Sequence, residues 1–172
     1  MELVSPSLAF ESEFAAFFAD FATNDRKNAD YYLQGVTDFG AYVQRLQDEA
    51  AGVNLKAGHV PCSHYWLFDD KGEMVGVIRV RHHIRTGFLS FEAGHIGYDI
   101  APSSRGRGLG KAMLALALPK VKALGIDTAL ITAQEDNMAS RRVIEANGGQ
   151  LENVVMGQVF PTLLARYWVS CE

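Results

Sequence analysis

A glycine-rich segment, PSSRGRGLGKAML at residues 102–114, places three glycines and two arginines within six residues. It follows an apolar run that ends at Ile100 and precedes a run rich in leucine, alanine and methionine, so it is predicted to join a strand to a helix. Glycines let a backbone approach a ligand closely, and the free N–H groups at a helix start attract anions. Arg105 and Arg107 can add charge-assisted hydrogen bonds. The segment therefore predicts a site for a phosphate or similar anion, although a turn that only caps a helix would share part of the pattern.

Two familiar phosphate-binding patterns fit this segment poorly. A P-loop needs a glycine, four residues and then Gly-Lys-Ser/Thr, whereas here Ala112 follows the lysine and Arg105 stands in place of the first glycine. A dinucleotide fingerprint needs its third glycine where Lys111 stands, and it normally opens a fold. The remaining pattern is Arg-x-x-Gly-x-Gly, formed by Arg105, Gly108 and Gly110. A nucleotide-binding domain is therefore the weakest interpretation.

Length and composition favour one globular domain over residues 1–172. Hydrophobic residues make up 48% and charged residues 21%, which is enough apolar material for one sizeable core. The net charge of −4 argues against a general nucleic-acid-binding surface. We see neither a membrane-spanning run nor a signal-peptide pattern, and Cys62 and Cys171 form no disulfide framework. We therefore expect a cytoplasmic protein with no nucleic-acid or membrane partner.

The hydrophobic pattern predicts a mixed α/β protein. Residues 10–22 carry phenylalanines at helical spacing, which indicates an amphipathic helix packed on a core. A polar loop is expected over 23–37, followed by a helix that starts at Thr37 or Asp38 and stops at Gly52. The other expected elements are a weak strand at 2–9, a hairpin at 64–84, a strand at 94–102, a helix at 109–124 that Pro119 should kink, a strand at 127–133, a helix at 137–149 capped by Asn137, and closing strands in LENVV and LLARYWVS.

With these elements in place, IGYDIAPSSRGRGLGKAML resembles motif A of the GCN5-related N-acetyltransferase (GNAT) superfamily. NMASRRVIEANGG resembles motif B of the same family. The resemblance covers roughly 64–169, and it is closer still to a branch of uncharacterised bacterial predicted acetyltransferases that share VP…YWL, RHH, GHIGY and RYWV. It implies a GNAT-like α/β fold, in which a central, mostly antiparallel sheet is splayed at a β-bulge and flanked by helices.

The resemblance also implies that acetyl-CoA is the acyl donor and that no metal takes part. The pantetheine arm would enter the splayed gap and pair with the backbone of Tyr98, Asp99 and Ile100. Asn137 and Ser140 would lie near the CoA arm, although a plain helix N-cap also explains Asn137. The pyrophosphate would rest on Arg105, Gly106, Arg107, Gly108, Leu109, Gly110 and Lys111.

The implied chemistry is direct attack of a neutral amine on the thioester, which calls for a base and for a proton on the departing thiolate. Many relatives carry a motif B tyrosine for the second role, whereas this chain has Ile144 there. Tyr98 and Tyr167 are possible substitutes, and a thiolate whose thiol has a pKa of about 8.5 can also leave unaided. His95 and Glu92 are the candidate bases, although His95 could instead bond the adjacent strand and Glu92 could face solvent.

Two further polar clusters lie in the predicted hairpin and just before it. Arg81 would suit an acceptor that bears a carboxylate, but it could equally belong to an exposed face. The two histidines at 82–83 point to opposite faces of a strand, so they do not easily chelate one metal. His59, Cys62 and His64 form an H-x2-C-x-H pattern without a second cluster, so we expect no zinc site.

The main hypothesis is an acetyl-CoA-dependent N-acetyltransferase acting on a primary amine of a small molecule or peptide. Helices at about 10–52 would wall the acceptor site, and the core at about 64–169 would bind acyl-CoA. The alternative is a non-catalytic acyl-CoA-binding module or sensor, which the missing motif B tyrosine keeps open. An acidic acceptor pocket would favour a polycation, and a basic one an amino acid or its derivative. The strand RYWVS could pair across a homodimer.

Overall fold

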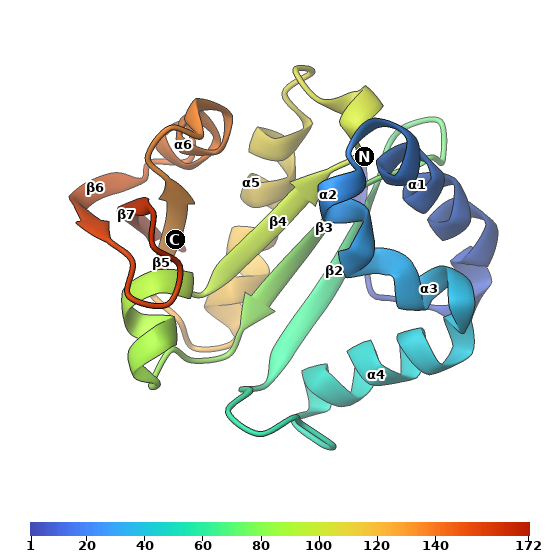
Figure 1. Cartoon of the computed structure of the whole chain (residues 1–172), viewed down its shortest axis with the longest axis horizontal. Helices are drawn as coiled ribbons and strands as arrows, with labels where there is room; N and C mark the ends of the chain where they lie inside the picture. Colours follow the sequence, from blue (N-terminus) through green and yellow to red (C-terminus); the bar gives the residue numbers. More distant parts are fainter.

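A computed structural model describes residues 1–172, and its strands form two antiparallel sheets (Figure 1). The first sheet has the order β1-β2-β3-β4, with β1 (Glu2–Val4), β2 (Cys62–Phe68), β3 (Met74–Arg81) and β4 (Ile96–Ile100). The second has the order β5-β7-β6, with β5 (Thr128–Gln134), β6 (Gln150–Met156) and β7 (Leu163–Ser170). No ladder joins β4 to β5, so the sheets diverge there and leave a gap. The mixed α/β fold with antiparallel strands flanked by helices is confirmed, whereas the register shifts lie in β2 and β6 and none occurs between β3 and β4.

Helices cover both faces of the first sheet. They are α1 (Glu11–Asn24), α2 (Arg26–Ala29), α3 (Leu33–Thr37), α4 (Phe39–Ala51), α5 (Leu109–Ala123) and α6 (Met138–Glu145), with short helical turns at Leu8–Phe10, Asp30–Tyr32, Leu89–Ala93 and Pro102–Ser104. Figure 1 shows α1 to α4 along one side of the sheet, while α5 lies on the other side. No helix is both long and apolar enough to cross a membrane.

The predicted loop at residues 23–37 is wrong, because this segment folds into α2, a turn and α3. Ala29 and Tyr32 point inward, whereas Leu33 and Val36 stay exposed with most of the polar residues. Tyr32 and Gly35 are buried, and a Cβ on Gly35 would come within 2.1 Å of the Phe14 ring. Tight packing against α1 therefore fixes a segment whose own sequence signals a turn. The first strand is also shorter than expected, since it ends at Val4, ahead of Pro6.

Other local predictions are confirmed. The Asp38 side chain accepts the N–H of Ala41 and caps α4, which ends before Gly52. The expected core helix is present, and its Phe14, Phe17 and Phe21 are buried in one hydrophobic cluster with Trp66. A second cluster lies between α5 and both sheets.

The proposed dimer contact through RYWVS is wrong for a physical reason. β7 lies between β5 and β6, and it forms ladders with both. Neither edge of β7 is free, so this strand cannot pair with a second chain.

The two sheets meet at Gly94 and His95, just before β4 begins. Gly94 has a φ of 64°, and a Cβ there would lie 2.5 Å from the carbonyl oxygen of Leu130. The N–H of His95 donates to that carbonyl at 2.7 Å, and the N–H of Leu130 donates to Nδ1 of His95 at 2.9 Å. His95 is only 7% exposed. One residue therefore pins β4 to β5 at the closed end of the gap.

We expect His95→Leu to lower the free energy of unfolding by about 1–3 kcal/mol, because it leaves the buried N–H of Leu130 without its acceptor. Urea denaturation measures this change. His59→Leu, at an exposed position, is the matched control and should stay within about 0.5 kcal/mol of wild type. Equal effects of the two substitutions would contradict the role assigned to the His95 ring.

The same contact predicts a dependence of stability on pH. Burial lowers the pKa of His95 below its ordinary value of 6.5, and Arg81 and His83 add repulsion of the same sign. The unfolded chain therefore binds the proton more readily than the folded one, so this contribution is complete above pH 6.5 and is lost as pH falls below it. In urea denaturation at stepped pH, His95→Leu should lose stability less steeply on acidification than wild type. Parallel pH profiles would contradict this account.

Candidate functional site

The open edge of β4 presents unpaired backbone groups to the gap. In an antiparallel ladder, successive residues direct their backbone groups to alternate edges of the strand. The N–H of Arg81 donates to the His95 carbonyl and that of Ala101 to the Val75 carbonyl, so the odd-numbered residues of β4 pair with β3. The N–H and C=O of Tyr98, like the N–H of Ile100, therefore face the gap. Asp99 does not, because it pairs with β3.

α6 is tied to this strand through the side chain of Tyr98. The Tyr98 hydroxyl lies 2.8 Å from Oγ of Ser140 and donates to the Ser140 carbonyl at 3.2 Å. Burial raises the pKa of Tyr98 to about 12, so its hydroxyl stays protonated at neutral pH. The Asn137 side chain accepts the N–H of Ser140 at 3.1 Å and caps α6, as expected from the sequence. Tyr98, Asn137 and Ser140 thus lie together.

Ile144, at the position where relatives have a tyrosine, points elsewhere. It is fully buried in the hydrophobic cluster between α5 and the sheets. Tyr167, the other suggested substitute, has its hydroxyl engaged, since it donates to Glu145 at 2.7 Å and accepts from Arg141 at 2.8 Å. Tyr98 is the candidate hydroxyl that lies on the strand bordering the gap.

The glycine-rich turn leaves an open backbone at the start of α5. Gly108, with a φ of 77°, precedes the helix, and nothing lies within 4 Å of where its Cβ would stand. No side chain caps the helix, so the N–H groups of Leu109, Gly110 and Lys111 have no partner within the chain. These donors and the helix dipole make the turn suitable for an anion. The exposed Arg107 and Lys111 form no ion pair.

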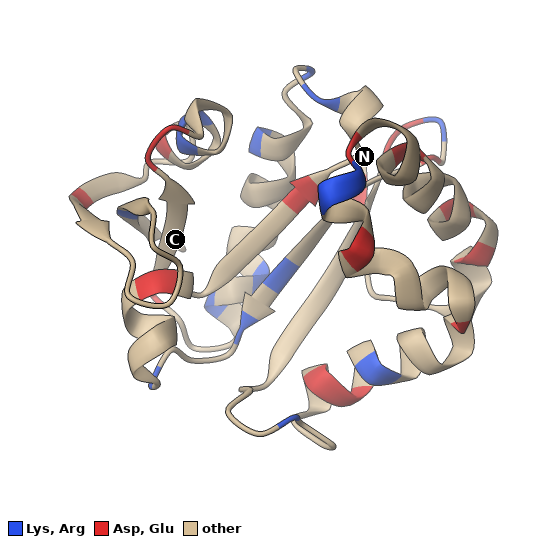
Figure 2. Ribbon diagram, in the orientation of Figure 1, with Lys and Arg blue, Asp and Glu red and all other residues tan.

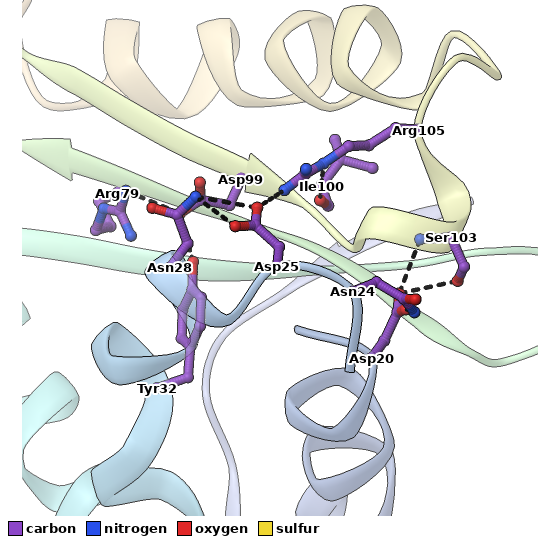
Figure 3. A network of polar contacts seen from close by, with 10 residues as sticks. All are labelled: Asp20, Asn24, Asp25, Asn28, Tyr32, Arg79, Asp99, Ile100, Ser103 and Arg105. Atoms are coloured by element: carbon purple, nitrogen blue, oxygen red, sulfur yellow. Dashed lines mark hydrogen bonds and ion pairs between the residues drawn. The ribbon is translucent and has the colours of Figure 1, made fainter. Parts of the chain in front are cut away.

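Arg105 connects this turn to the N-terminal helices (Figure 3). Its Nη2 donates to Asp25 at 2.7 Å, and its Nε donates to the carbonyl of Ile100 at 3.0 Å. Beside it, the N–H and hydroxyl of Ser103 donate to Asp20 at 3.0 and 2.8 Å. Two of the five N–H groups of the Arg105 guanidinium are therefore already committed to contacts inside the protein.

The side chain of Asp99 lies on the side of the N-terminal helices, on the face of β4 opposite to that of the Tyr98 side chain. Its carboxylate accepts the hydroxyl of Tyr32 at 2.5 Å and Nη2 of Arg79 at 3.3 Å. Figure 3 shows these side chains between the N-terminal helices and the sheet. The backbone of Asp99, which was expected to pair with the cofactor arm, pairs with β3 instead, and its side chain lies against the N-terminal helices.

Both candidate bases, His95 and Glu92, form hydrogen bonds that hold parts of the fold together. The ring of His95 accepts from β5, as described above. The carboxylate of Glu92 is 5% exposed and accepts three backbone N–H groups, from Gln158 at 2.6 Å, Val159 at 2.8 Å and Phe160 at 3.0 Å. Burial acts to raise the pKa of Glu92, but these three donors outweigh it and hold the pKa below its usual value. Neither side chain lines the cavity of the first sheet.

That cavity, of about 460 Å³, lies between the N-terminal helices and the faces of β2 and β3. Figure 2 shows basic positions near the end of β3, and a basic position next to acidic ones on α4. The walls of the cavity combine aromatic and aliphatic side chains with several charged ones. The charged or titratable ones are Arg45, Glu49, His59, Cys62, His64, Arg79 and Arg81, together with Tyr31, Tyr32 and Tyr42.

A polar chain crosses the floor of this cavity. Glu49 accepts Nη1 of Arg45 at 2.6 Å and lies 2.6 Å from Nε2 of His64. Burial acts to raise the pKa of Glu49, but His64 and Arg45 outweigh it and lower that pKa to about 2. Burial lowers the pKa of His64, although Glu49 opposes this. At neutral pH the chain is a carboxylate holding a neutral imidazole.

Sequence reasoning missed this chain, because His64 was considered as a metal ligand and as part of the VPCSHYW lining of the acceptor pocket, and not as a histidine held by a carboxylate. Arg45 and Glu49 are four residues apart on one predicted helix, and His64 faces Arg79 across the predicted hairpin. Those local signals were present in the sequence. The contact between the helix and the hairpin was not. In the structure, no group of three or more His, Cys, Asp or Glu side chains is arranged to hold a metal ion.

The other polar residues of the hairpin have separate partners. Nε2 of His82 lies 2.8 Å from Oγ of Ser63. His83 accepts the N–H of Arg85 at 3.4 Å. Burial raises the pKa of the Cys62 thiol to about 11, so this cysteine is no thiolate at neutral pH.

Solved structures share this fold at low sequence identity. The microcin C7 self-immunity acetyltransferase MccE, in complex with acetyl-CoA and AMP, matches with a TM-score of 0.69 at 15% identity, over 98% of this chain and 91% of MccE. RimJ of Mycobacterium smegmatis, in complex with CoA-disulfide, matches with a TM-score of 0.71 at 19% identity, over 98% and 80%. A variant of the spermidine N-acetyltransferase SpeG of Vibrio cholerae matches with a TM-score of 0.62 at 12% identity, over 99% and 95%. At these identities the likeness shows the fold alone.

Sequence comparison gives the family. A search of curated protein sequences finds no match. A profile of the acetyltransferase (GNAT) domain matches residues 9–150, which is most of the chain and includes both the glycine-rich turn and the open strand β4. This chain is therefore a member of the GNAT acetyltransferase family.

Proposed function

We propose that this protein is an acetyl-CoA-dependent N-acetyltransferase that transfers the acetyl group to a primary amine of a small molecule or peptide. The observation that carries the proposal is the open edge of β4, which is followed, after the glycine-rich turn, by a helix start with unpaired N–H groups. We take these two features as one track for a ligand. Such a track suits a long ligand that has amide groups along its arm and a pyrophosphate at its end, as acetyl-CoA has.

Each part of acetyl-CoA has a place in this proposal. The pantetheine arm pairs with the free N–H and C=O of Tyr98 and with the N–H of Ile100. The pyrophosphate binds the N–H groups of residues 109–111, with Arg107 and Lys111 near its charge. MccE with acetyl-CoA and RimJ with CoA-disulfide support this choice of ligand.

The acceptor binds in the cavity of the first sheet, walled by the N-terminal helices. This assignment follows the expected division of the chain into an acceptor side at about 10–52 and a cofactor core at about 64–169. The amine attacks the thioester directly. A covalent relay through Cys62 is disfavoured, because a thiol with a pKa of about 11 is a poor nucleophile at neutral pH.

His64 is the proton acceptor in this scheme, directly or through a water. Its ring lines the cavity, is neutral above pH 6.5, and is held in place by Glu49. Tyr98 keeps its proton, because its pKa is raised to about 12, and its hydroxyl acts here only as a hydrogen-bond donor toward the departing thiolate. His95 and Glu92 then act as positioning residues, since one pins β4 to β5 and the other holds the backbone at 158–160.

The first prediction from the proposed function concerns the glycine-rich turn. Arg107→Glu should weaken acetyl-CoA binding about tenfold or more, because it places a negative charge beside the pyrophosphate. Acetyl-CoA at a hundred times its Kd should stabilise the wild-type protein by about 2.7 kcal/mol, which a thermal shift detects. Arg85→Glu, an equal change of charge at an exposed residue outside the cavity, is the control and should leave the shift intact. No wild-type shift, or equal shifts in ATP, would overturn the cofactor assignment.

The second prediction concerns the base. With the best acceptor from an amine panel, His64→Gln should reduce kcat about a hundredfold and remove the acidic limb of the pH–rate profile. Glu49→Gln should move that limb to lower pH, because Glu49 raises the pKa of His64. His59→Gln, at an exposed histidine on the same cavity, should leave the limb in place. An unchanged limb in His64→Gln would exclude His64 as the base. Acetyl-CoA binding without release of CoA to any amine would favour the non-catalytic binding module.

A further inference from the structure

Arg81 is a partly buried cation that has no counterion within the chain. It is the last residue of β3, and its Nη1 donates to the carbonyls of Ala93 at 3.4 Å and Gly94 at 3.1 Å. None of the ion pairs in the structure includes it. Its Nε and Nη2 donate to no atom of the protein, and the side chain lines the cavity. Removing a cation from water without a partner is costly, so this position is prepared for an anion.

The remaining charges of the cavity already compensate one another. Arg45 pairs with Glu49, which also holds His64. Arg79 pairs with Asp99. One positive charge therefore remains, and it lies on Arg81. A polycationic acceptor would meet three arginines here, with Glu49 as the only carboxylate on the cavity wall.

The rest of the wall suits an apolar body. Leu46, Val60, Val77 and Leu89 are buried there, and Tyr31 and Phe88 stand exposed beside the opening at 72% and 38%. A volume of about 460 Å³ is within the usual range for a small-molecule site. The cavity thus combines apolar walls with charges that are paired within the protein and one guanidinium, that of Arg81, that has no counterion.

Arg81 also lies at an end of the cavity from which it can orient an acceptor. It is next to Gly94, where the two sheets are joined, and its backbone pairs with His95. Beyond that junction, the side chain of Arg79 lies over Gly97. The open edge of β4 begins after this point. An anion held by Arg81 therefore sits at the closed end, and the rest of the acceptor extends toward the edge assigned to the thioester arm.

We propose that the acceptor is an amino acid with an aromatic or large aliphatic side chain, whose carboxylate binds Nε and Nη2 of Arg81 while its amino group receives the acetyl group. This inference rests on the proposed function. In the reaction, the amine nitrogen forms a bond to the acetyl carbon as the carbon–sulfur bond breaks. The sulfur leaves as the thiolate of CoA, and the amine proton passes to the base.

A matched set of amines tests the inference. L-phenylalanine, L-phenylalaninamide and phenethylamine share one apolar body and differ at the carboxylate, and L-leucine with L-leucinamide repeats the comparison. Spermidine serves as the polycationic alternative. We expect kcat/KM, measured by CoA release, to be about a hundredfold higher for the amino acids than for the amides and amines. A preference for an amide, for phenethylamine or for spermidine would overturn the inference and leave the proposed function standing.

Variants of Arg81 show whether this residue reads the carboxylate. Arg81→Gln should lower kcat/KM for L-phenylalanine about a hundredfold and change that for L-phenylalaninamide less than about threefold. Arg81→Lys should retain part of the preference, because it keeps the charge but loses the paired donors. Arg85→Gln is the control outside the cavity. A normal thermal shift with acetyl-CoA shows that each variant is folded, and equal losses on both amines would overturn the inference.

Binding decides the matter if no amine releases CoA. In that case the proposed enzymatic function fails, and titration of the CoA-loaded protein with L-phenylalanine and with phenethylamine replaces the rate measurement. A preference for L-phenylalanine that disappears in Arg81→Gln would support the carboxylate site. Equal binding, or no binding of either compound, would overturn it.

Discussion

The fold depends on the contact that holds β4 against β5 at one point only. There, Gly94 lets the backbones approach, and His95 exchanges two hydrogen bonds with Leu130. Beyond this point the strands share no ladder, so β4 keeps a free edge inside the protein. A free strand edge normally attracts another strand, and here its short length and the neighbouring helices limit that risk. The same geometry leaves backbone groups of β4 free, and our proposal is that a ligand pairs with them as a strand would.

β4 serves two compartments because its residues alternate between faces. The side chain of Tyr98 reaches α6, while the side chain of Asp99 reaches Tyr32 and Arg79 on the other face. The turn that follows β4 contacts the N-terminal helices through Arg105 and Ser103. A shift of the N-terminal helices would therefore displace both the wall of the cavity and the turn assigned to the pyrophosphate. The pair of Arg105 and Asp25 is partly exposed, so we regard it as a positioning contact with little effect on stability.

The sequence predicted those features that depend on local chemistry. The glycine-rich turn before a helix, the caps at Asp38 and Asn137, and the hairpin at 64–84 follow from neighbouring residues, and the structure has them. Residues 23–37 were misjudged because packing against Phe14 outweighs their local turn signals. The pairing of Glu49 with His64, and of Glu92 with the backbone of 158–160, joins segments far apart in the chain. No spacing in the sequence indicates such contacts. For this reason His95 and Glu92, which hold the framework, were named as bases from the sequence, and His64 in the cavity was not.

The most direct measurement is amide hydrogen exchange by NMR, with and without acetyl-CoA. Pairing of the cofactor arm with β4 predicts new protection at the amides of Tyr98 and Ile100 and at residues 109–111. The amides of Gly97 and Asp99, already paired with β3, should change little. This alternation along one strand would place the ligand in the gap. Protection confined to the turn, or spread evenly along β4, would contradict the central claim that the open strand edge receives acetyl-CoA.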